Sequence, residues 1–138
     1  MTQLPWPTSR LRRLSYLATQ HALRHERGLT LYYARQAHEI AEQYHVGYYL
    51  AWAGMLLAWA NAKQSPGADA VVAMQAAIEG VHATGARLRL PLYQAMLAEC
   101  LGDIGETEAA LAALDQAFEC AGRTGEHWVD AEVYRLRG

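Results

Sequence analysis

Alanine triplets with one fixed spacing recur three times along the chain, and this repeat constrains the fold more than any other feature. In each triplet the second alanine follows the first by 12 residues, and the third follows the second by 7 residues. The members are Ala22, Ala34 and Ala41, then Ala58, Ala70 and Ala77, then Ala98, Ala110 and Ala117. Successive triplets are offset by 36 and 40 residues, and Gly138 stands 40 residues beyond Ala98. A repeat of this length is typical of proteins that stack one small unit on the next.

Helix-breaking stretches punctuate the triplets at regular places. A short stretch lies between the first and second alanine of each triplet: Glu26–Gly28, Gln64–Gly67 and Asp103–Gly105. Longer breaks separate one triplet from the next, at Tyr44–Gly47, Ala83–Arg89 and Gly122–Gly125. We predict a non-helical lead-in over residues 1–8 and one helical repeat domain over residues 9–138. Its predicted helices span residues 9–25, 29–44, 48–63, 67–82, 90–103, 106–121 and 126–138.

Composition favours helices over strands. The 138 residues include 26 alanines and 18 leucines, against nine valines and isoleucines together. Alanine and leucine lose little conformational freedom in a helix, whereas β-branched side chains are restrained at χ1. Alanine at a recurring position also lets two helix axes cross closely. We therefore expect an all-α fold, a right-handed α-solenoid of about three helical hairpins and a terminal helix. The alternative is an irregular alanine-rich bundle.

The spacing of the small residues resembles that of tetratricopeptide repeats, which place one small residue in the first helix of a hairpin and two in the second. The resemblance extends over five stretches, Tyr49–Trp52, His82–Leu88, Leu97–Glu99, Arg123–Trp128 and Ala131–Gly138. These stretches are similar to the C-terminal repeat region of large bacterial signalling proteins. In that family the repeats follow a nucleotide-binding ATPase segment, often with a class III adenylate cyclase or DNA-binding domain further upstream. The resemblance implies tetratricopeptide-like hairpins that mediate interactions within a signalling or transcriptional regulator.

Motifs that carry catalytic chemistry are missing from the sequence. A P-loop needs a lysine after a glycine-rich turn, but the only lysine, Lys63, lies in an alanine-rich stretch. Asp103, Glu106 and Glu108 cluster around one turn, where paired carboxylates and a solvated helix start are the two interpretations. We favour the solvated helix start. The resemblance carries over no catalytic residue either, so we expect a protein that is not an enzyme and uses no cofactor.

The charge pattern argues against a nucleic-acid partner. The formal net charge is −2, and the arginines form short doublets rather than one stripe. These doublets are Arg12 with Arg13, Arg87 with Arg89, and Arg135 with Arg137, and we expect them on a solvated surface.

The expected location is the cytoplasm. The sequence has no apolar run of about 18 residues that would span a membrane, and Met1–Arg13 lacks the apolar segment of a signal peptide. Cys100 and Cys120 form neither a CxxC pair nor a disulfide framework, which fits a reducing compartment. Each cysteine stands beside a packing position, so we interpret both as small core residues rather than nucleophiles.

Three histidines fall at patterned positions of the first hairpin. His21 and His25 lie one helical turn apart, and His38 stands between Ala34 and Ala41. In the repeat register all three point into the hairpin, so a zinc or nickel site is one hypothesis. The hypothesis that we favour is half-buried histidines bonded to the backbone or to Glu26, because no carboxylate or cysteine completes a ligand set.

An apolar groove on the first helices of the hairpins is the candidate binding surface. The repeat register directs a set of residues on these helices toward the inner face of the solenoid. The predicted groove consists of Tyr16, Leu23, Trp52, Met55, Trp59, Leu92 and Glu99. Tryptophan and methionine favour an adaptable surface, so we expect a protein, a peptide or an adjacent domain to bind here. Trp52 and Trp59 could instead pack in the core. A small-molecule or metal sensor domain is the alternative function.

The predicted terminal helix lacks a hairpin partner. Its apolar residues Trp128, Val133 and Tyr134 would then remain uncovered, and an uncovered apolar face favours symmetric pairing. We expect a homodimer that pairs through these three residues. The competing hypothesis is that the helix folds back on the third hairpin and the chain stays monomeric.

Overall fold

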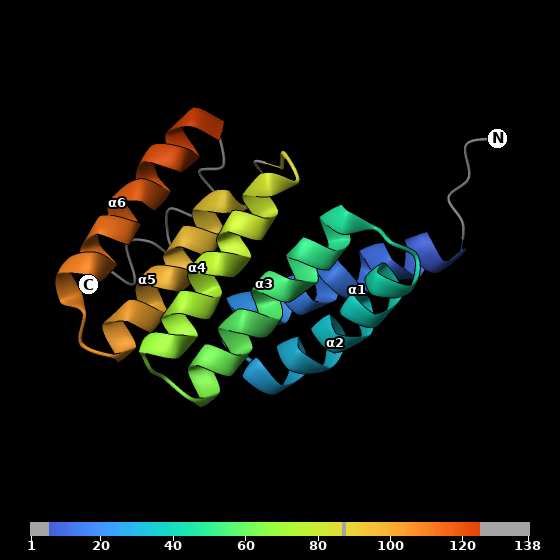
Figure 1. The fold of residues 1–138 in the computed structure, drawn as a ribbon, viewed down its shortest axis with the longest axis horizontal. Coiled ribbons are helices and arrows are strands. Elements are labelled where there is room, and N and C mark those ends of the chain that lie inside the picture. The colour runs from blue at the N-terminus through green and yellow to red at the C-terminus, as the bar shows by residue number, and fades with distance from the viewer. Residues whose placement is uncertain (1–5, 87, 125–138) are drawn as a thin grey trace.

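Six α-helices make up the part of the chain that the computed structural model describes, residues 6–86 and 88–124 (Figure 1). They are α1 (Trp6–Leu23), α2 (Arg27–Gln43), α3 (Gly47–Gln64), α4 (Ala68–Ala83), α5 (Leu90–Asp103) and α6 (Thr107–Thr124). The described residues contain no strand, so the predicted all-α class is confirmed. The helix predicted over residues 126–138 lies outside the described residues.

The ends of these helices agree with the predicted ends to within three residues. The largest difference at a helix start is in α1, which begins at Trp6 rather than at residue 9. The predicted non-helical lead-in is therefore wrong for residues 6–8. Pro7 does not prevent the early start, because the first N–H groups of a helix have no intrahelical acceptor and a proline there loses no hydrogen bond.

The helix bounds repeat with a period of about 40 residues. The second helices of the three hairpins begin at Arg27, Ala68 and Thr107, and the first two of them end at Gln43 and Ala83. With a uniform 40-residue period, the first small position of the three hairpins falls at residues 18, 58 and 98. The second falls at residues 30, 70 and 110, and the third at residues 37, 77 and 117. The prediction that the first triplet is equivalent to the second, at an offset of 36 residues, is therefore wrong, whereas the offset of 40 between the second and third agrees with the helix bounds.

The first hairpin differs from its predicted register by four residues. By the starts of the second helices, its equivalent small positions are Ala18, Thr30 and Ala37 rather than Ala22, Ala34 and Ala41, although both sets are buried. The alanine pattern missed this register because a threonine occupies the middle position. Thr30 Oγ1 donates a hydrogen bond to the Glu26 carbonyl oxygen at 3.0 Å, which satisfies the hydroxyl within a close helix crossing.

The turn of the first hairpin also lies earlier than predicted. It spans residues 24–26, and Gly28 lies inside α2 instead of in the turn. His25 allows this because it adopts a left-handed backbone conformation with φ of 60°. The equivalent position of the third hairpin is Gly105, with φ of 82°, where glycine adopts this conformation without a steric penalty.

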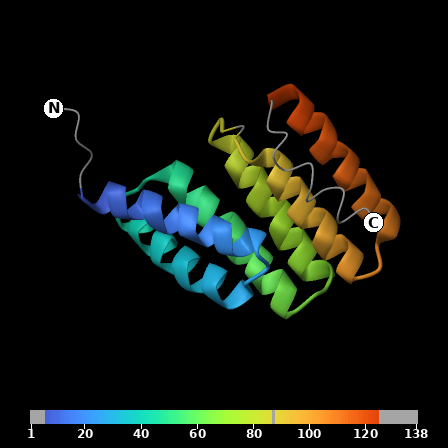
Figure 2. The same cartoon turned by 180° about the vertical axis from the view of Figure 1, so that it is seen from behind.

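Each helix packs against the next one along the chain, and α3 also contacts α1 and α5. We refer to α1, α3 and α5, the first helices of the three hairpins, as the odd helices. The main core cluster holds residues from all six helices, and a smaller cluster holds residues of α1, α2 and α3. Figures 1 and 2 show the hairpins following one another from the N-terminal to the C-terminal side. None of the described helices combines the length and apolar character needed to cross a bilayer.

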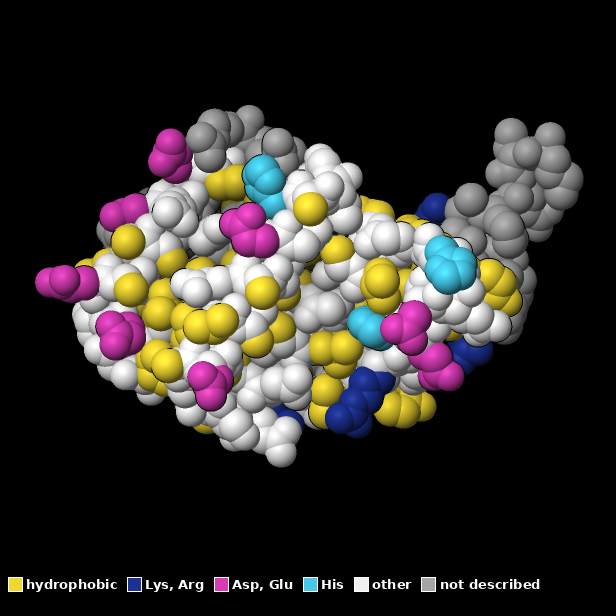
Figure 3. All heavy atoms as spheres, in the orientation of Figure 1, with side chains coloured by type: hydrophobic (Ala, Val, Ile, Leu, Met, Phe, Trp, Pro, Cys, Tyr) yellow, Lys and Arg dark blue, Asp and Glu magenta, His cyan; other side chains and the backbone are white. Residues whose placement is uncertain are grey.

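Charge is segregated along the chain. Residues 1–63 contain seven basic and three acidic side chains, whereas residues 64–122 contain two arginines and eight acidic side chains. In Figure 3 acidic side chains are spread over the half of the visible face that α4, α5 and α6 form, and the most prominent basic side chains lie toward the other half. A charged ligand would therefore be attracted to one half of the molecule and repelled by the other.

Candidate functional site

Four of the seven predicted groove residues are core residues. Trp52, Met55, Trp59 and Leu92 are at most 2% exposed and belong to the main core cluster. The prediction that they line an open groove is therefore wrong, and the competing interpretation of Trp52 and Trp59 as core residues is confirmed. The odd helices pack against one another directly, and these large side chains fill the space between them.

Tyr16 and Leu23, two further predicted groove residues, line an open pocket on α1. The pocket has a volume of about 260 Å³, and the segment that precedes α5 forms its opposite wall. We call it the partner pocket, and its residues are Tyr16, Thr19, Gln20, Leu23, Leu88 and Arg89. Tyr16 is 49% exposed and Leu88 is 51% exposed, so the pocket presents large apolar side chains to solvent. The predicted apolar surface is thus reduced to one pocket that joins the first and third hairpins.

A rigid aromatic base lies under the partner pocket. Trp52 Nε1 donates a hydrogen bond to Thr19 Oγ1 at 2.9 Å, and Thr19 in turn donates to the Ser15 carbonyl oxygen at 2.9 Å. The ring of Tyr16 packs edge-on against Trp52 with 5.0 Å between the ring centroids. Tyr49 also stacks on Trp52, with 5.7 Å between the ring centroids. Because the indole is fixed by a hydrogen bond and by ring contacts, the base beneath the pocket is preformed.

Arg89 is the most unusual residue of the pocket. Its guanidinium carbon lies 3.4 Å from the centroid of the Trp52 ring, a stacked cation–π contact. Its Nε donates a hydrogen bond to the Tyr93 hydroxyl at 3.2 Å, and its Nη2 donates to the Tyr48 hydroxyl. The residue is only 5% exposed, so the predicted solvated surface is wrong for Arg89. Arg87, the other member of this doublet, lies outside the described residues.

Local backbone geometry places the Arg89 side chain in this position. Arg89 caps the N-terminus of α5 with a left-handed φ of 67°, and its side chain lies over Trp52 of α3 while it also bonds Tyr93 of its own helix. Burial works to lower the pKa of Arg89, but Tyr93 and Tyr48 together raise it above its ordinary value. The guanidinium therefore remains charged at every physiological pH. Sequence reasoning missed Arg89. The sequence feature that could have indicated its bond to Tyr93 is the spacing of four residues between them, across the start of a helix.

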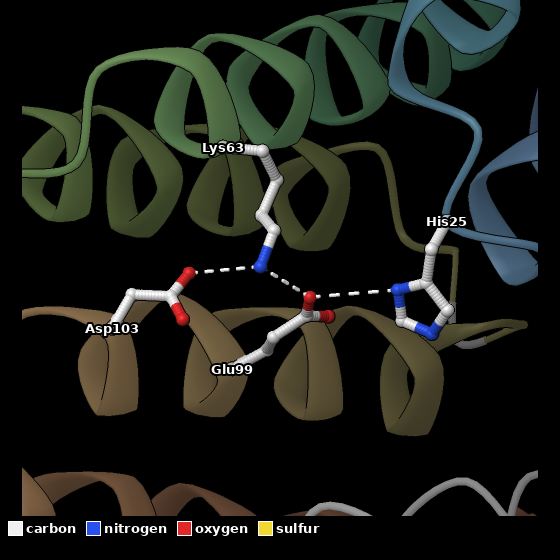
Figure 4. A network of polar contacts seen from close by, with 4 residues as sticks. All are labelled: His25, Lys63, Glu99 and Asp103. Atoms are coloured by element: carbon white, nitrogen blue, oxygen red, sulfur yellow. Dashed lines mark hydrogen bonds and ion pairs between the residues drawn. The ribbon is translucent and has the colours of Figure 1, made fainter.

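A second polar feature joins all three hairpins (Figure 4). Lys63 of α3 donates to Glu99 Oε2 at 2.5 Å and to Asp103 Oδ2 at 2.8 Å, both on α5. His25, in the turn after α1, lies with its Nδ1 3.5 Å from the same oxygen of Glu99. We call these four residues the ion-pair cluster. Glu99, the seventh predicted groove residue, thus has its side chain engaged by Lys63 and by the His25 ring rather than open to a partner.

The ion-pair cluster determines local proton affinities. Burial works to lower the pKa of Lys63, but hydrogen bonds and charge interactions with Asp103 and Glu99 raise it above its ordinary value. The neighbouring thiol of Cys100 is affected in the same direction, because burial and the charge of Glu99 raise its pKa to about 12. Cys100 is therefore a protonated core thiol at neutral pH, as predicted, and lacks the thiolate that a nucleophile needs.

His21 and His25 contact different carboxylates. His21 Nδ1 lies 3.1 Å from Glu26 Oε1, and its ring stacks on Tyr33, so the favoured interpretation is confirmed for His21. His25 reaches Glu99 on α5, so the prediction that it points into the first hairpin is wrong. His38 is half-buried. Within residues 6–86 and 88–124 no three histidine, cysteine or acidic side chains come together in a group that could hold a metal ion.

The residues predicted to pair two copies lie outside the described residues; they are Trp128, Val133 and Tyr134.

The partner pocket with its aromatic base and the ion-pair cluster are the two candidate sites that we consider among the described residues. Comparison of the sequence and the structure with known proteins finds no matching family model, no matching curated protein and no matching solved structure. The functional argument consequently depends on the geometry of these two sites.

Proposed function

We propose that this chain is a non-catalytic, tetratricopeptide-like α-solenoid module of a bacterial signalling or transcriptional regulator, and that it binds a protein or peptide segment. Three hairpins with a 40-residue period, each packed on the next through its first helix, support the solenoid architecture. The observation that carries the proposal is the partner pocket, an open apolar pocket on a fixed aromatic base.

The size of the partner pocket favours a side chain over a free small molecule. Its volume of about 260 Å³ lies below the roughly 300–1,000 Å³ typical of pockets for drug-sized ligands. One or two apolar side chains fit such a volume, and the exposed rings and aliphatic groups of Tyr16 and Leu88 would cover their flanks. Fixed aromatic side chains at the base cost little conformational entropy on binding.

The charge at the pocket gives the partner a second property. Arg89 lines the pocket and keeps its positive charge, because its proton affinity is raised by Tyr93 and Tyr48. An acidic residue next to the apolar anchor of the partner would lie in a favourable potential. The proposed partner is therefore a segment that carries a large apolar side chain beside an aspartate or glutamate.

A displayed library of random peptides, selected on the whole chain, tests this proposal. We expect enrichment of sequences that combine an apolar anchor with an acidic neighbour. The Leu88→Asp substitution should weaken their binding by about tenfold or more, because it places a charge at the mouth of the pocket. Val72→Asp is the matched control, since Val72 is an exposed apolar residue on α4, 62% exposed against 51% for Leu88, that does not line the pocket.

Three results would contradict the proposal. The first is a selection that enriches nothing, and the second is equal loss of binding in both variants. The third is a small molecule that binds the pocket when no peptide does, which would support the sensor function instead. The non-catalytic part of the proposal fails if the purified chain turns over ATP and a point substitution within it abolishes the turnover.

A further inference from the structure

The first helix carries charge of one sign only. The chain contains no aspartate or glutamate before Glu26. Four arginines precede that residue, Arg10, Arg12, Arg13 and Arg24. Arg12 and Arg13 are exposed, which confirms the solvated surface predicted for this doublet. No carboxylate of the described residues forms an ion pair with Arg12 or Arg13, so a direct contact neutralises neither charge there.

Arg12 and Arg13 lie next to the partner pocket on α1. Tyr16, which lines the pocket, follows Arg12 by four residues and Arg13 by three, and side chains at these spacings are neighbours on a helix surface. At 1.5 Å per residue, the doublet lies about 10 Å along the axis from the middle of the stretch between Tyr16 and Leu23. The pocket therefore has one buried cation, Arg89, in its opposite wall and two exposed cations beside it on α1.

We infer that the bound segment continues from its apolar anchor along α1 toward the N-terminal end of this helix, and that a short acidic stretch of the segment lies over Arg12 and Arg13. The inference rests on the proposed function, because the partner pocket must first hold the anchor. An extended chain advances about 3.3 Å per residue, so about 10 Å corresponds to about three residues. The carboxylates therefore lie about two to four residues from the anchor.

The small number of cations favours an acidic protein segment over a nucleic acid. A surface that binds nucleic acid usually carries many basic side chains in one stripe, because its affinity comes largely from neutralised phosphates. Two exposed arginines beside one apolar pocket are too few for such a stripe. They suit two or three carboxylates that follow a large apolar side chain, because opposite charges then meet across the edge of the interface.

Binding of paired peptides to the whole chain tests the inference. The anchor and its acidic neighbour come from a peptide that the selection on the chain enriches. One derivative carries glutamates two to four positions from the anchor on both sides, and the other carries glutamines there. We expect the glutamate peptide to bind about three to ten times more tightly at low ionic strength, and this preference to shrink as salt is added.

Arginine variants then locate the contact. Arg12→Gln and Arg13→Gln should each reduce the preference for the glutamate peptide and leave the binding of the glutamine peptide unchanged. Arg35→Gln is the matched control, because it removes the same charge from an exposed position on α2. It should leave the preference unchanged.

The other outcomes overturn the inference in distinguishable ways. Equal binding of the two peptides would contradict the acidic contact and leave the proposed function standing. Equal effects of all three arginine variants would mean that the overall charge, rather than α1, determines the preference. Tighter binding of a single-stranded oligonucleotide, lost in Arg12→Gln and Arg13→Gln, would assign the doublet to a nucleic acid. A selection that enriches no peptide would contradict the proposed function and this inference together.

Discussion

The two buried tryptophans of the described core have different chemical surroundings. Trp52 donates its indole N–H to Thr19 and carries the Arg89 guanidinium on its ring face. Trp59 is equally buried, but its Nε1 has no hydrogen-bond acceptor among the described residues. One side chain is therefore part of a polar and aromatic network, and the other stabilises mainly through its apolar area.

This difference predicts unequal effects of the same substitution. Trp52→Phe leaves the Thr19 hydroxyl without its donor and removes the best ring for cation–π stacking, whereas Trp59→Phe removes no hydrogen bond. We expect Trp52→Phe to lower the free energy of unfolding by about 1 kcal/mol more than Trp59→Phe. Urea denaturation followed by circular dichroism measures both. Equal losses in the two variants would show that the Trp52 network contributes no net stability.

At the scale of the helix, the small residues determine how closely neighbours cross. The sequence predicted every described helix because leucine and alanine periodicity and the turn residues agree along the chain. It misplaced the first hairpin by four residues, because Thr30 occupies a position that alanine fills elsewhere and His25 closes a turn that glycine closes elsewhere. Both exceptions depend on backbone geometry and local hydrogen bonds, which an amino-acid pattern does not display.

Helix crossings respond to added volume. We expect Ala98→Leu and Ala110→Leu to lower the free energy of unfolding by about 1–3 kcal/mol, because both alanines are buried at equivalent small positions. Ala112→Leu is the control, since Ala112 is exposed on α6 and leucine is also a good helix former. Chemical denaturation gives the three values. Identical midpoints for all three variants would mean that the 40-residue register is wrong.

The ion-pair cluster connects α3 and α5 and predicts a dependence on alkaline pH. The pKa of Lys63 is raised in the folded chain, so its stabilising effect is complete below the ordinary lysine value of 10.5 and is lost as the pH rises through the higher folded value. We expect Lys63→Met to lower the free energy of unfolding by about 1 kcal/mol at pH 7. The difference between the two proteins should disappear in strong alkali. A difference that stays constant to the highest accessible pH would exclude the charge interaction as its cause.

Across the whole molecule, the candidate site depends on contacts between hairpins. Sequence reasoning placed Tyr16 and Leu23 on the binding surface by counting from Ala22, a register that is four residues off, and both residues line the partner pocket nevertheless. It assigned Trp52 and Trp59 to the same surface, although packing between the odd helices buries them. It also missed Arg89 and the Lys63–Glu99 pair, since the partners lie 36 to 41 residues apart in sequence and meet only when the hairpins stack.

The central claim is that the partner pocket binds a peptide segment on the aromatic base formed by Trp52. Titration of the isotope-labelled chain with an enriched peptide, followed by nuclear magnetic resonance, tests it most directly. We predict that the Trp52 indole N–H signal and the amides of Thr19 and Leu88 shift first and most, because Thr19 and Leu88 line the pocket and Trp52 bonds to Thr19. Shifts confined to Gly102 and Leu111, which line a separate pocket between α5 and α6, with the Trp52 signal unchanged, would contradict the account.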